Sequence, residues 1–150
     1  MKAKLKLSVG AALIAVAAFF GSKSAAQETP ITRSQLPKAA QAFLTKYFPG
    51  QEISRIIRDK ELMRTEYEVY LANSVKAEFD GNGAWKEVES KQQPLPVTFI
   101  PSNITRHISA NFPAQKIIKV EKTKAKYEVE LSNGMDLDFN AKGNFLRVDD

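Results

Sequence analysis

Few side chains in this sequence are of a type that could carry out catalysis. The chain has a single histidine, His107, and no cysteine, which excludes a thiolate nucleophile and a zinc site of the usual kind. His107 directly precedes Ile108 in a run with helical spacing, and a partly buried helix residue is favoured there over a base that lacks a positioned partner. The glycine-rich phosphate-binding motifs and the nucleophile-elbow motif are absent. We therefore predict that the protein is not an enzyme and holds no cofactor.

The remaining candidates for chemistry are carboxylates, and they alternate with apolar residues in two similar segments. Residues 67–80 read YEVYLANSVKAEFD, and residues 127–140 read YEVELSNGMDLDFN. Each segment is typical of a strand, a turn and a second strand. Its recurrence indicates a duplicated supersecondary unit. On an open sheet, nothing would desolvate these acids enough to separate their pKa values, so we expect them to bind and not to catalyse.

The length of the turn decides which of these residues face each other. A two-residue turn in the second segment would place Leu131 opposite Asp136, whereas a three-residue turn (residues 132–134) pairs Leu131 with Met135. Because directly opposed residues share a face of the sheet, the three-residue turn is favoured. In the first segment Ser74 then takes the left-handed position that a glycine adopts more cheaply.

With this register, one face of each hairpin is apolar and the other places like charges opposite one another, at a cost of a fraction of a kcal/mol each. Tyr70 and Lys76 in the first hairpin stand where Glu130 and Asp136 stand in the second. The predicted partner-binding site on this polar face consists of Glu68, Tyr70, Lys76, Glu78, Glu128, Glu130, Asp136 and Asp138.

Two explanations of the polar face stay open. It is either a solvated surface whose acids are screened by cations on neighbouring strands, or a recognition surface for a basic partner or a hard cation. A dedicated calcium loop is not expected, because residues 80–83 do not match the EF-hand spacing, and no metal site is predicted. Tyr70 would be an aromatic anchor on such a surface, whereas Trp85 is expected to cover the end of the core. The cations expected to screen the acids are Lys86, Lys119, Lys126 and Arg147.

The first 26 residues have the features of a cleaved signal peptide. Three lysines precede an apolar run at residues 7–20, which is rather short for a membrane span, and small residues follow at positions 24–26. We therefore expect a periplasmic or secreted protein with no membrane span after cleavage. A lipid anchor is excluded because it requires a cysteine.

Removing this segment almost neutralises the chain. The whole sequence carries 22 Lys and Arg against 17 Asp and Glu, a net charge of +5. Four of the lysines, and no acid, lie in the first 26 residues, which leaves about +1 for the rest. A nearly neutral protein gives no electrostatic reason to expect a nucleic-acid partner.

The rest of the chain divides into two similar repeats. Residues 27–35 are polar and are expected to form a flexible lead-in, repeat 1 covers 36–90, a stiff linker covers 91–99, and repeat 2 covers 100–150. Leu36-Pro37 in repeat 1 matches Ile100-Pro101 in repeat 2, and each pair opens an expected helix. Four strands are expected after each helix, so the fold is α+β with two tandem α-β-β-β-β repeats.

At this point the chain resembles the PepSY-like, β-lactamase-inhibitor-protein-like exported domains of Bacteroidetes-type bacteria. The motifs that carry the resemblance are Leu36-Pro37, Phe48-Pro49-Gly50, Asn133-Gly134 and Asp80-Gly81-Asn82-Gly83-Ala84-Trp85, within about residues 36–149. The resemblance implies one curved antiparallel sheet with helices packed on one face. In the inhibitor proteins of this shape, the open sheet face grips a partner enzyme, and PepSY domains are associated with restraining peptidases. Ala114 replaces the helix-ending glycine and the disulfides of the secreted inhibitors are missing, so inhibition of a β-lactamase is not implied.

The function predicted from these observations is that of an exported, non-enzymatic binding module of the protein-interaction or inhibitor-like kind. Its partner is expected to be another exported or periplasmic protein, for example a peptidase or another enzyme. The alternative is a periplasmic sensor domain that binds a small ligand or a cation through the same carboxylates.

Overall fold

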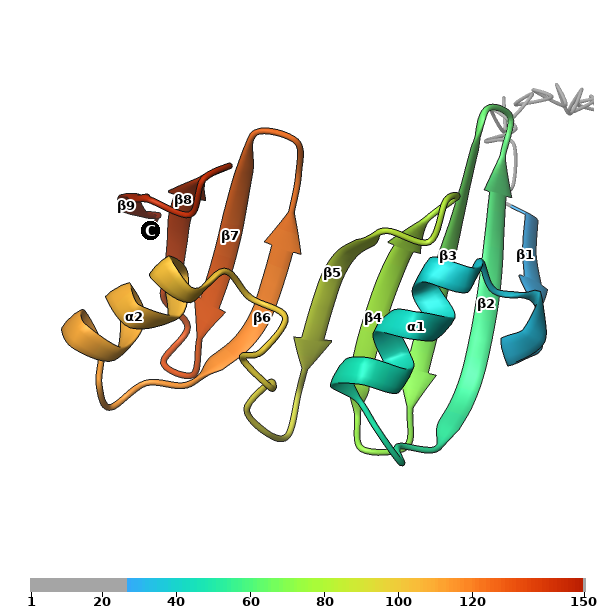
Figure 1. Cartoon of the computed structure of the whole chain (residues 1–150), viewed down its shortest axis with the longest axis horizontal. Helices are drawn as coiled ribbons and strands as arrows, with labels where there is room; N and C mark the ends of the chain where they lie inside the picture. The colour runs from blue at the N-terminus through green and yellow to red at the C-terminus, as the bar shows by residue number, and fades with distance from the viewer. Residues whose placement is uncertain (1–26, 150) are drawn as a thin grey trace, which may run out of the picture.

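A computed structural model describes residues 27–149, which form one nine-stranded antiparallel sheet with two α-helices on one of its faces (Figure 1). The predicted signal peptide lies outside the described residues. The sheet order is β1 to β9, so each strand pairs with its neighbours in sequence. The elements are β1 (Gln27–Pro30), a 3-10 helix η1 (Arg33–Gln35), α1 (Lys38–Tyr47), β2 (Ile53–Glu61), β3 (Arg64–Leu71), β4 (Val75–Asp80), β5 (Trp85–Ser90), α2 (Ser102–Asn111), β6 (Ile117–Lys122), β7 (Lys126–Leu131), β8 (Asp136–Asn140) and β9 (Phe145–Asp149).

The α+β fold and its two repeats are as predicted. Each helix begins directly after a proline, Pro37 or Pro101, where the missing N–H removes no helical hydrogen bond. Each helix buries one apolar stripe against the sheet, and each is followed by four strands. The buried helix residues are Ala40, Phe43 and Leu44 in α1 and Ile104 and Ile108 in α2.

The core lies between the helices and an apolar row that crosses the sheet. This row has one member on each strand from β3 to β8, and every member is fully buried because the helices cover it. Its members, in sheet order, are Val69, Ala77, Val88, Val120, Val129 and Leu137.

The predicted three-residue turns are confirmed. In the second hairpin the N–H of Leu131 donates to the carbonyl of Met135 at 2.9 Å, and Gly134 has a φ of 83°. In the first hairpin Tyr70 pairs with Lys76, and Ser74 takes the left-handed position with a φ of 67°. Both hairpins therefore present their acids on the face opposite the helices.

The prediction of a flexible lead-in at residues 27–35 is wrong. Residues 27–30 form β1, which pairs with β2 from Gln27 opposite Lys60 to Pro30 opposite Ile57, and residues 33–35 form η1. An edge strand is held by backbone hydrogen bonds and needs no apolar side chains. The polar sequence of residues 27–30, with its proline, therefore lacks the pattern from which a strand is predicted.

The two repeats share β5, which is the last strand of the first and the strand before the helix of the second. β5 pairs with β6 through Val88 opposite Val120, and the linker folds back so that the N–H of Leu95 donates to the carbonyl of Ile117 at 3.0 Å. β1 has the same place before β2 that β5 has before β6. Trp85 of β5 packs against Phe99 of the linker with ring centroids 5.3 Å apart, at the end of the core as predicted.

Within residues 27–149, none of the helices has the length and apolar character needed to cross a membrane.

Candidate functional site

One carboxylate stands on each of six neighbouring strands, β3 to β8, across the face opposite the helices. Neighbouring strands lie about 4.8 Å apart, so these acids form a continuous row of like charges. A second row beside it adds Glu89, Glu130, Asp136 and Asp149, so that the two rows hold ten of the chain's 17 acidic residues, although residues 27–150 have a net charge of only about +1. The first row consists of Glu68, Glu78, Glu87, Glu121, Glu128 and Asp138.

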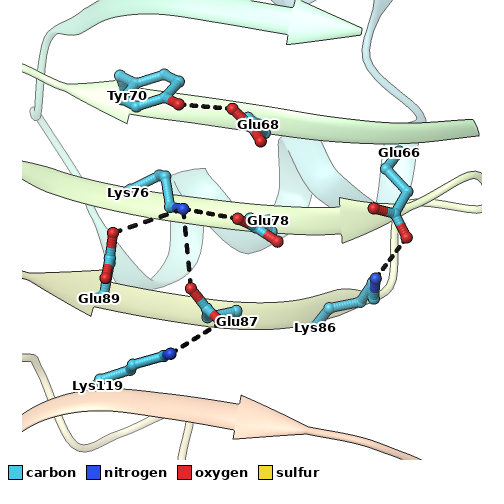
Figure 2. A network of polar contacts seen from close by, with 9 residues as sticks. All are labelled: Glu66, Glu68, Tyr70, Lys76, Glu78, Lys86, Glu87, Glu89 and Lys119. Carbon is cyan, nitrogen blue, oxygen red and sulfur yellow. Dashed lines mark hydrogen bonds and ion pairs between the residues drawn. The ribbon is translucent and has the colours of Figure 1, made fainter. Parts of the chain in front are cut away.

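Lys76 forms ion pairs with two acids of this row in the first repeat, Glu78 and Glu87, and with Glu89 of the second row. Its Nζ lies 2.7 Å from Oε1 of Glu78 on the same strand, and 3.5 Å and 3.8 Å from Oε1 of Glu89 and Oε1 of Glu87 on β5 (Figure 2). Burial by itself would lower the pKa of Lys76, but these three carboxylates raise it overall, so the lysine stays charged. Lys119 of β6 adds a second cation 3.3 Å from Oε2 of Glu87.

The other polar side chains of the first repeat are also bound to one another. The hydroxyl of Tyr70 donates to Glu68, which raises the pKa of Tyr70, and the guanidinium of Arg55 lies 4.2 Å from the centre of its ring. Tyr70 is therefore a half-buried member of the network, and not the freely exposed anchor that the sequence allowed. Lys86 donates to Glu66 at the end of the same face (Figure 2).

Asp138, one of the eight predicted partner-binding residues, is not accessible to a partner. It is only 2 % exposed, and both of its carboxylate oxygens are engaged. Nζ of Lys126 lies 2.9 Å from Oδ1 and Nη2 of Arg147 lies 2.9 Å from Oδ2. Lys126 also binds Glu128 at 2.9 Å.

Three acids of the second repeat have no such cation. Across residues 27–149, no lysine or arginine nitrogen lies within 4.0 Å of Glu121, Glu130 or Asp136. The cause is in the sequence, because Glu130 and Asp136 replace the Tyr70 and Lys76 of the first repeat. We call Glu121, Glu130 and Asp136 the open acids.

The two explanations of the polar face therefore apply to different parts of it. The four cations that were expected to screen the acids do so. Lys119, Lys126 and Arg147 each pair with an acid on the same or a neighbouring strand, and Lys86 of β5 reaches across β4 to Glu66 of β3. The open acids are the part of the face that these cations do not pair with. Glu87 and Glu121 were missed by the sequence analysis. Each stands opposite an acid of its own repeat, Glu78 or Glu128, and the β5–β6 pairing places the two opposite each other. The charged alternation of Lys119 and Glu121 was the one available signal.

A groove borders Glu130, one of the open acids. It has a volume of about 480 Å³ and lies where the linker leaves the sheet beside the start of β6. Lys116, Ile118, Lys119 and Glu130 line its floor, and residues 89–94 line its other wall.

The described residues form neither a catalytic constellation nor a metal centre. His107 lies flat against Phe145, with ring centroids 4.3 Å apart and planes 15° apart, and its ring nitrogen has Asn111 as its polar neighbour. It is partly buried, as predicted. Within residues 27–149, no three histidine, cysteine, aspartate or glutamate side chains come together to hold a metal ion.

Comparison with known families agrees with this fold. A family model described as "Putative beta-lactamase-inhibitor-like, PepSY-like" matches residues 23–74 and 65–147. The chain belongs to this family. The resemblance inferred from the motifs is confirmed, and the two matches agree with a repeated unit.

Solved structures of Bacteroides proteins are similar to this member of the PepSY-like family. A protein of Bacteroides vulgatus described as a "putative periplasmic protein" is 34% identical, with a TM-score of 0.79 over 84% of this chain and 99% of its own. A Bacteroides thetaiotaomicron protein described as a "putative calcium-regulated periplasmic protein" is 35% identical, with a TM-score of 0.79 over 82% of this chain and 97% of its own. A second Bacteroides vulgatus protein, described as being of unknown function, is 34% identical, with a TM-score of 0.77 over 82% and 99%. No curated protein matches the chain.

These relatives confirm the predicted periplasmic location.

Proposed function

We propose that this PepSY-like protein is a periplasmic, non-enzymatic binding module that holds a protein with a basic surface against the polar face of its sheet. The partner is another exported or periplasmic protein, for example a peptidase or another enzyme. The inhibitor-like description of the family supports a protein partner. The observation that carries the proposal is the presence of the open acids, Glu121, Glu130 and Asp136, on the second repeat.

The charges of the face indicate where the partner binds. In the first repeat Lys76 already occupies the centre of its acids, so a basic partner would have to break existing ion pairs to bind there. The open acids have no such pairs to lose, and a cation placed beside them relieves the repulsion between Glu130 and Asp136, which stand directly opposite each other. The open acids therefore supply the attraction, and the groove beside Glu130 offers room for a side chain of the partner.

The test is capture of a partner from periplasmic extract on the immobilised mature protein. Wild type is compared with Glu130→Lys/Asp136→Lys, and any captured protein is purified and its affinity is measured for both forms. We expect the double variant to bind at least about tenfold more weakly, since two attractive contacts become repulsive. Binding by wild type should weaken as salt is raised.

A matched control is Glu28→Lys/Glu52→Lys, which makes the same charge change at exposed residues away from the open acids. This control should bind as wild type does, and thermal melts should show that all forms are folded. The proposal fails if the captured protein binds the open-acid variant and the control with equal affinity, or if wild type captures nothing that the variant releases.

A cation is the second candidate. The observation that favours it is the Bacteroides thetaiotaomicron relative described as "putative calcium-regulated", which is 35% identical. Carboxylate oxygens are the ligands that Ca²⁺ prefers, and within the described residues no lysine or arginine nitrogen lies within 4.0 Å of the open acids. Because no three acids there are grouped as a metal site, an ion would be held by one or two carboxylates and water.

A thermal melt separates the two candidates. Ca²⁺ at about 5 mM, far above the dissociation constant of a weak extracellular-type site, should raise the Tm of wild type and leave that of Glu130→Lys/Asp136→Lys unchanged. Mg²⁺ at the same concentration is the control. A Tm of wild type that does not respond to Ca²⁺ rules out the cation and leaves the protein partner untouched.

A further inference from the structure

The last strand of the sheet, β9, is the counterpart of β5, but its outer edge is uncovered in the described residues. Val148 of β9 aligns with Val88 of β5, and Asp149 aligns with Glu89. β6 covers the outer edge of β5, and Val88 is fully buried. Val148 is 36% exposed and Leu146 is 56% exposed. The same strand position therefore has a partner in the first repeat and none in the second.

The two edges of the sheet differ in how well they are protected. β1, at one edge, is short and polar and contains Pro30, which has no N–H to donate. β9, at the other edge, contains no proline and exposes Phe145, Leu146 and Val148. An unpaired edge strand presents a row of free N–H and C=O groups, which are a template for another strand.

We propose that β9 pairs antiparallel with β9 of a second copy of this chain, which joins the two sheets edge to edge. The pairing is centred on Val148, so that Val148 faces its own counterpart and Arg147 faces Asp149 of the second copy. A two-fold axis repeats the second contact, which gives two ion pairs around an apolar centre. The internal β5–β6 pairing has this pattern on one side of its centre, with Val88 opposite Val120 and Glu89 opposite Lys119, and has Glu87 opposite Glu121 on the other side.

Only this register is complementary in charge. Centring the pair on Arg147 would place two arginines opposite each other, and centring it on Asp149 would do the same with two aspartates. A shift by one residue would pair Val148 with Arg147 or Asp149, which places an apolar residue opposite a charged one. A strand from an unrelated protein has no reason to satisfy this pattern, whereas a second copy satisfies it twice.

This dimer goes beyond the proposed function and does not depend on it. An axis perpendicular to the sheet keeps the polar faces of both copies on one side and the helices on the other. The open acids then remain accessible in both copies. The dimer and the binding of a basic partner can therefore fail separately.

The experiment is sedimentation velocity of the whole mature protein over a range of concentrations, from about 5 to 500 µM, because a short edge-to-edge interface is expected to be weak. We expect the mass to approach that of a dimer as the concentration rises. Asp149→Lys should weaken dimerisation at least about tenfold, since both ion pairs become repulsive. Glu52→Lys makes the same charge change at an exposed residue far from β9 in sequence and should dimerise as wild type does.

A mixture of two variants tests the register. Arg147→Glu and Asp149→Lys should each be monomeric alone, but together they place Arg147 opposite Asp149 and Glu opposite Lys, so the mixture should form a heterodimer. Thermal melts show that each variant is folded, which matters because Arg147 also binds Asp138 and Asp149 of its own chain, at 2.9 Å and 3.5 Å. The proposal is overturned if wild type stays monomeric at every concentration, which would leave the edge to a strand of another protein. It is also overturned if Asp149→Lys dimerises as wild type does, or if the mixture stays monomeric.

Discussion

The hairpins β3–β4 and β7–β8 share a backbone and differ in charge. Both have a three-residue turn that ends in a left-handed residue, and both face the helices with an apolar ladder. On the polar face, Lys76 of the first hairpin closes a network of carboxylates, whereas its counterpart Asp136 adds one more acid. Because the pairing register is the same, two substitutions in a duplicated unit are enough to turn a self-neutralising surface into one with open acids.

This difference explains how residues 27–150, with a net charge of only about +1, can carry a local cluster of negative charge. The acids of the polar face would repel one another strongly if they stood alone, but lysines and Arg147 are interleaved with most of them. In the first repeat Glu68 is bound by the hydroxyl of Tyr70, whereas the open acids of the second repeat have neither an ion pair nor such a donor among the described residues. The proposed partner would therefore be attracted most strongly to the second repeat.

The largest expected effect on stability comes from substituting the glycine in the turn that follows each hairpin. Gly83→Ala should destabilise the protein by about 3 kcal/mol, because Gly83 has a φ of 85° and its Cβ would lie 2.7 Å from Cβ of Pro37 and 2.9 Å from the backbone nitrogen of Ala40. Gly143→Ala should cost about 2 kcal/mol, since it displaces the side chain of Asn103, which is softer than backbone.

Chemical denaturation of both variants measures this difference. Gly134→Ala is the control, because its Cβ would meet nothing within 4 Å and only the left-handed conformation is strained, at about 1 kcal/mol. Equal losses of unfolding free energy for the variants at residues 83 and 143 would show that the two helices do not differ in how rigidly they pack on their turns.

An intermediate effect on stability is expected from removing the cation of the first hairpin or adding a cation to the second. Lys76→Met should destabilise by about 2 kcal/mol, because three carboxylates lose their shared cation in a partly buried place. Asp136→Lys should instead stabilise by up to about 1 kcal/mol, because it places a cation opposite Glu130. Urea denaturation measures both, and Lys91→Met, at an exposed residue, is the control. A stabilising Lys76→Met would contradict the comparison.

The smallest effect distinguishes two carboxylates of the first repeat by pH. Burial raises the pKa of Glu66, but Lys86 and Arg64 outweigh this and lower it overall, so its contribution to stability is present above its ordinary pKa of 4.5 and is lost as pH falls through the lower folded value. Burial, together with the charge of Glu78, raises the pKa of Glu87 in spite of Lys119 and Lys76, so the penalty for its charge is relieved as pH falls.

As the pH falls from 7 to 3, the free energy of unfolding of wild type should therefore decrease relative to that of Glu66→Gln. Over the same range it should increase relative to that of Glu87→Gln. Each change should be under about 1 kcal/mol, because both side chains are partly exposed to solvent. Urea denaturation at a series of pH values measures the two differences, and slopes of the same sign would refute the assignment.

Local features were predictable from the sequence to different degrees. The turn register follows from alternation and turn chemistry within a dozen residues, and for that reason it was predicted down to the pairs Glu128–Asp138 and Glu68–Glu78. The burial of Asp138 was not predicted, because it depends on Lys126 and Arg147 approaching from both neighbouring strands. β1 was missed because pairing at an edge leaves almost no apolar signal.

The sequence by itself determined the duplication, the two faces of each hairpin and the replacement of Lys76 by Asp136, because these depend on the period of a strand and on residue identity. Only the tertiary structure decided that β5 serves both repeats and that Glu87 meets Glu121 across it. That pairing joins residues on either side of a linker and a helix, and no local period specifies it. The continuous row of acids and the position of the open acids within the polar face are therefore properties of the assembled sheet.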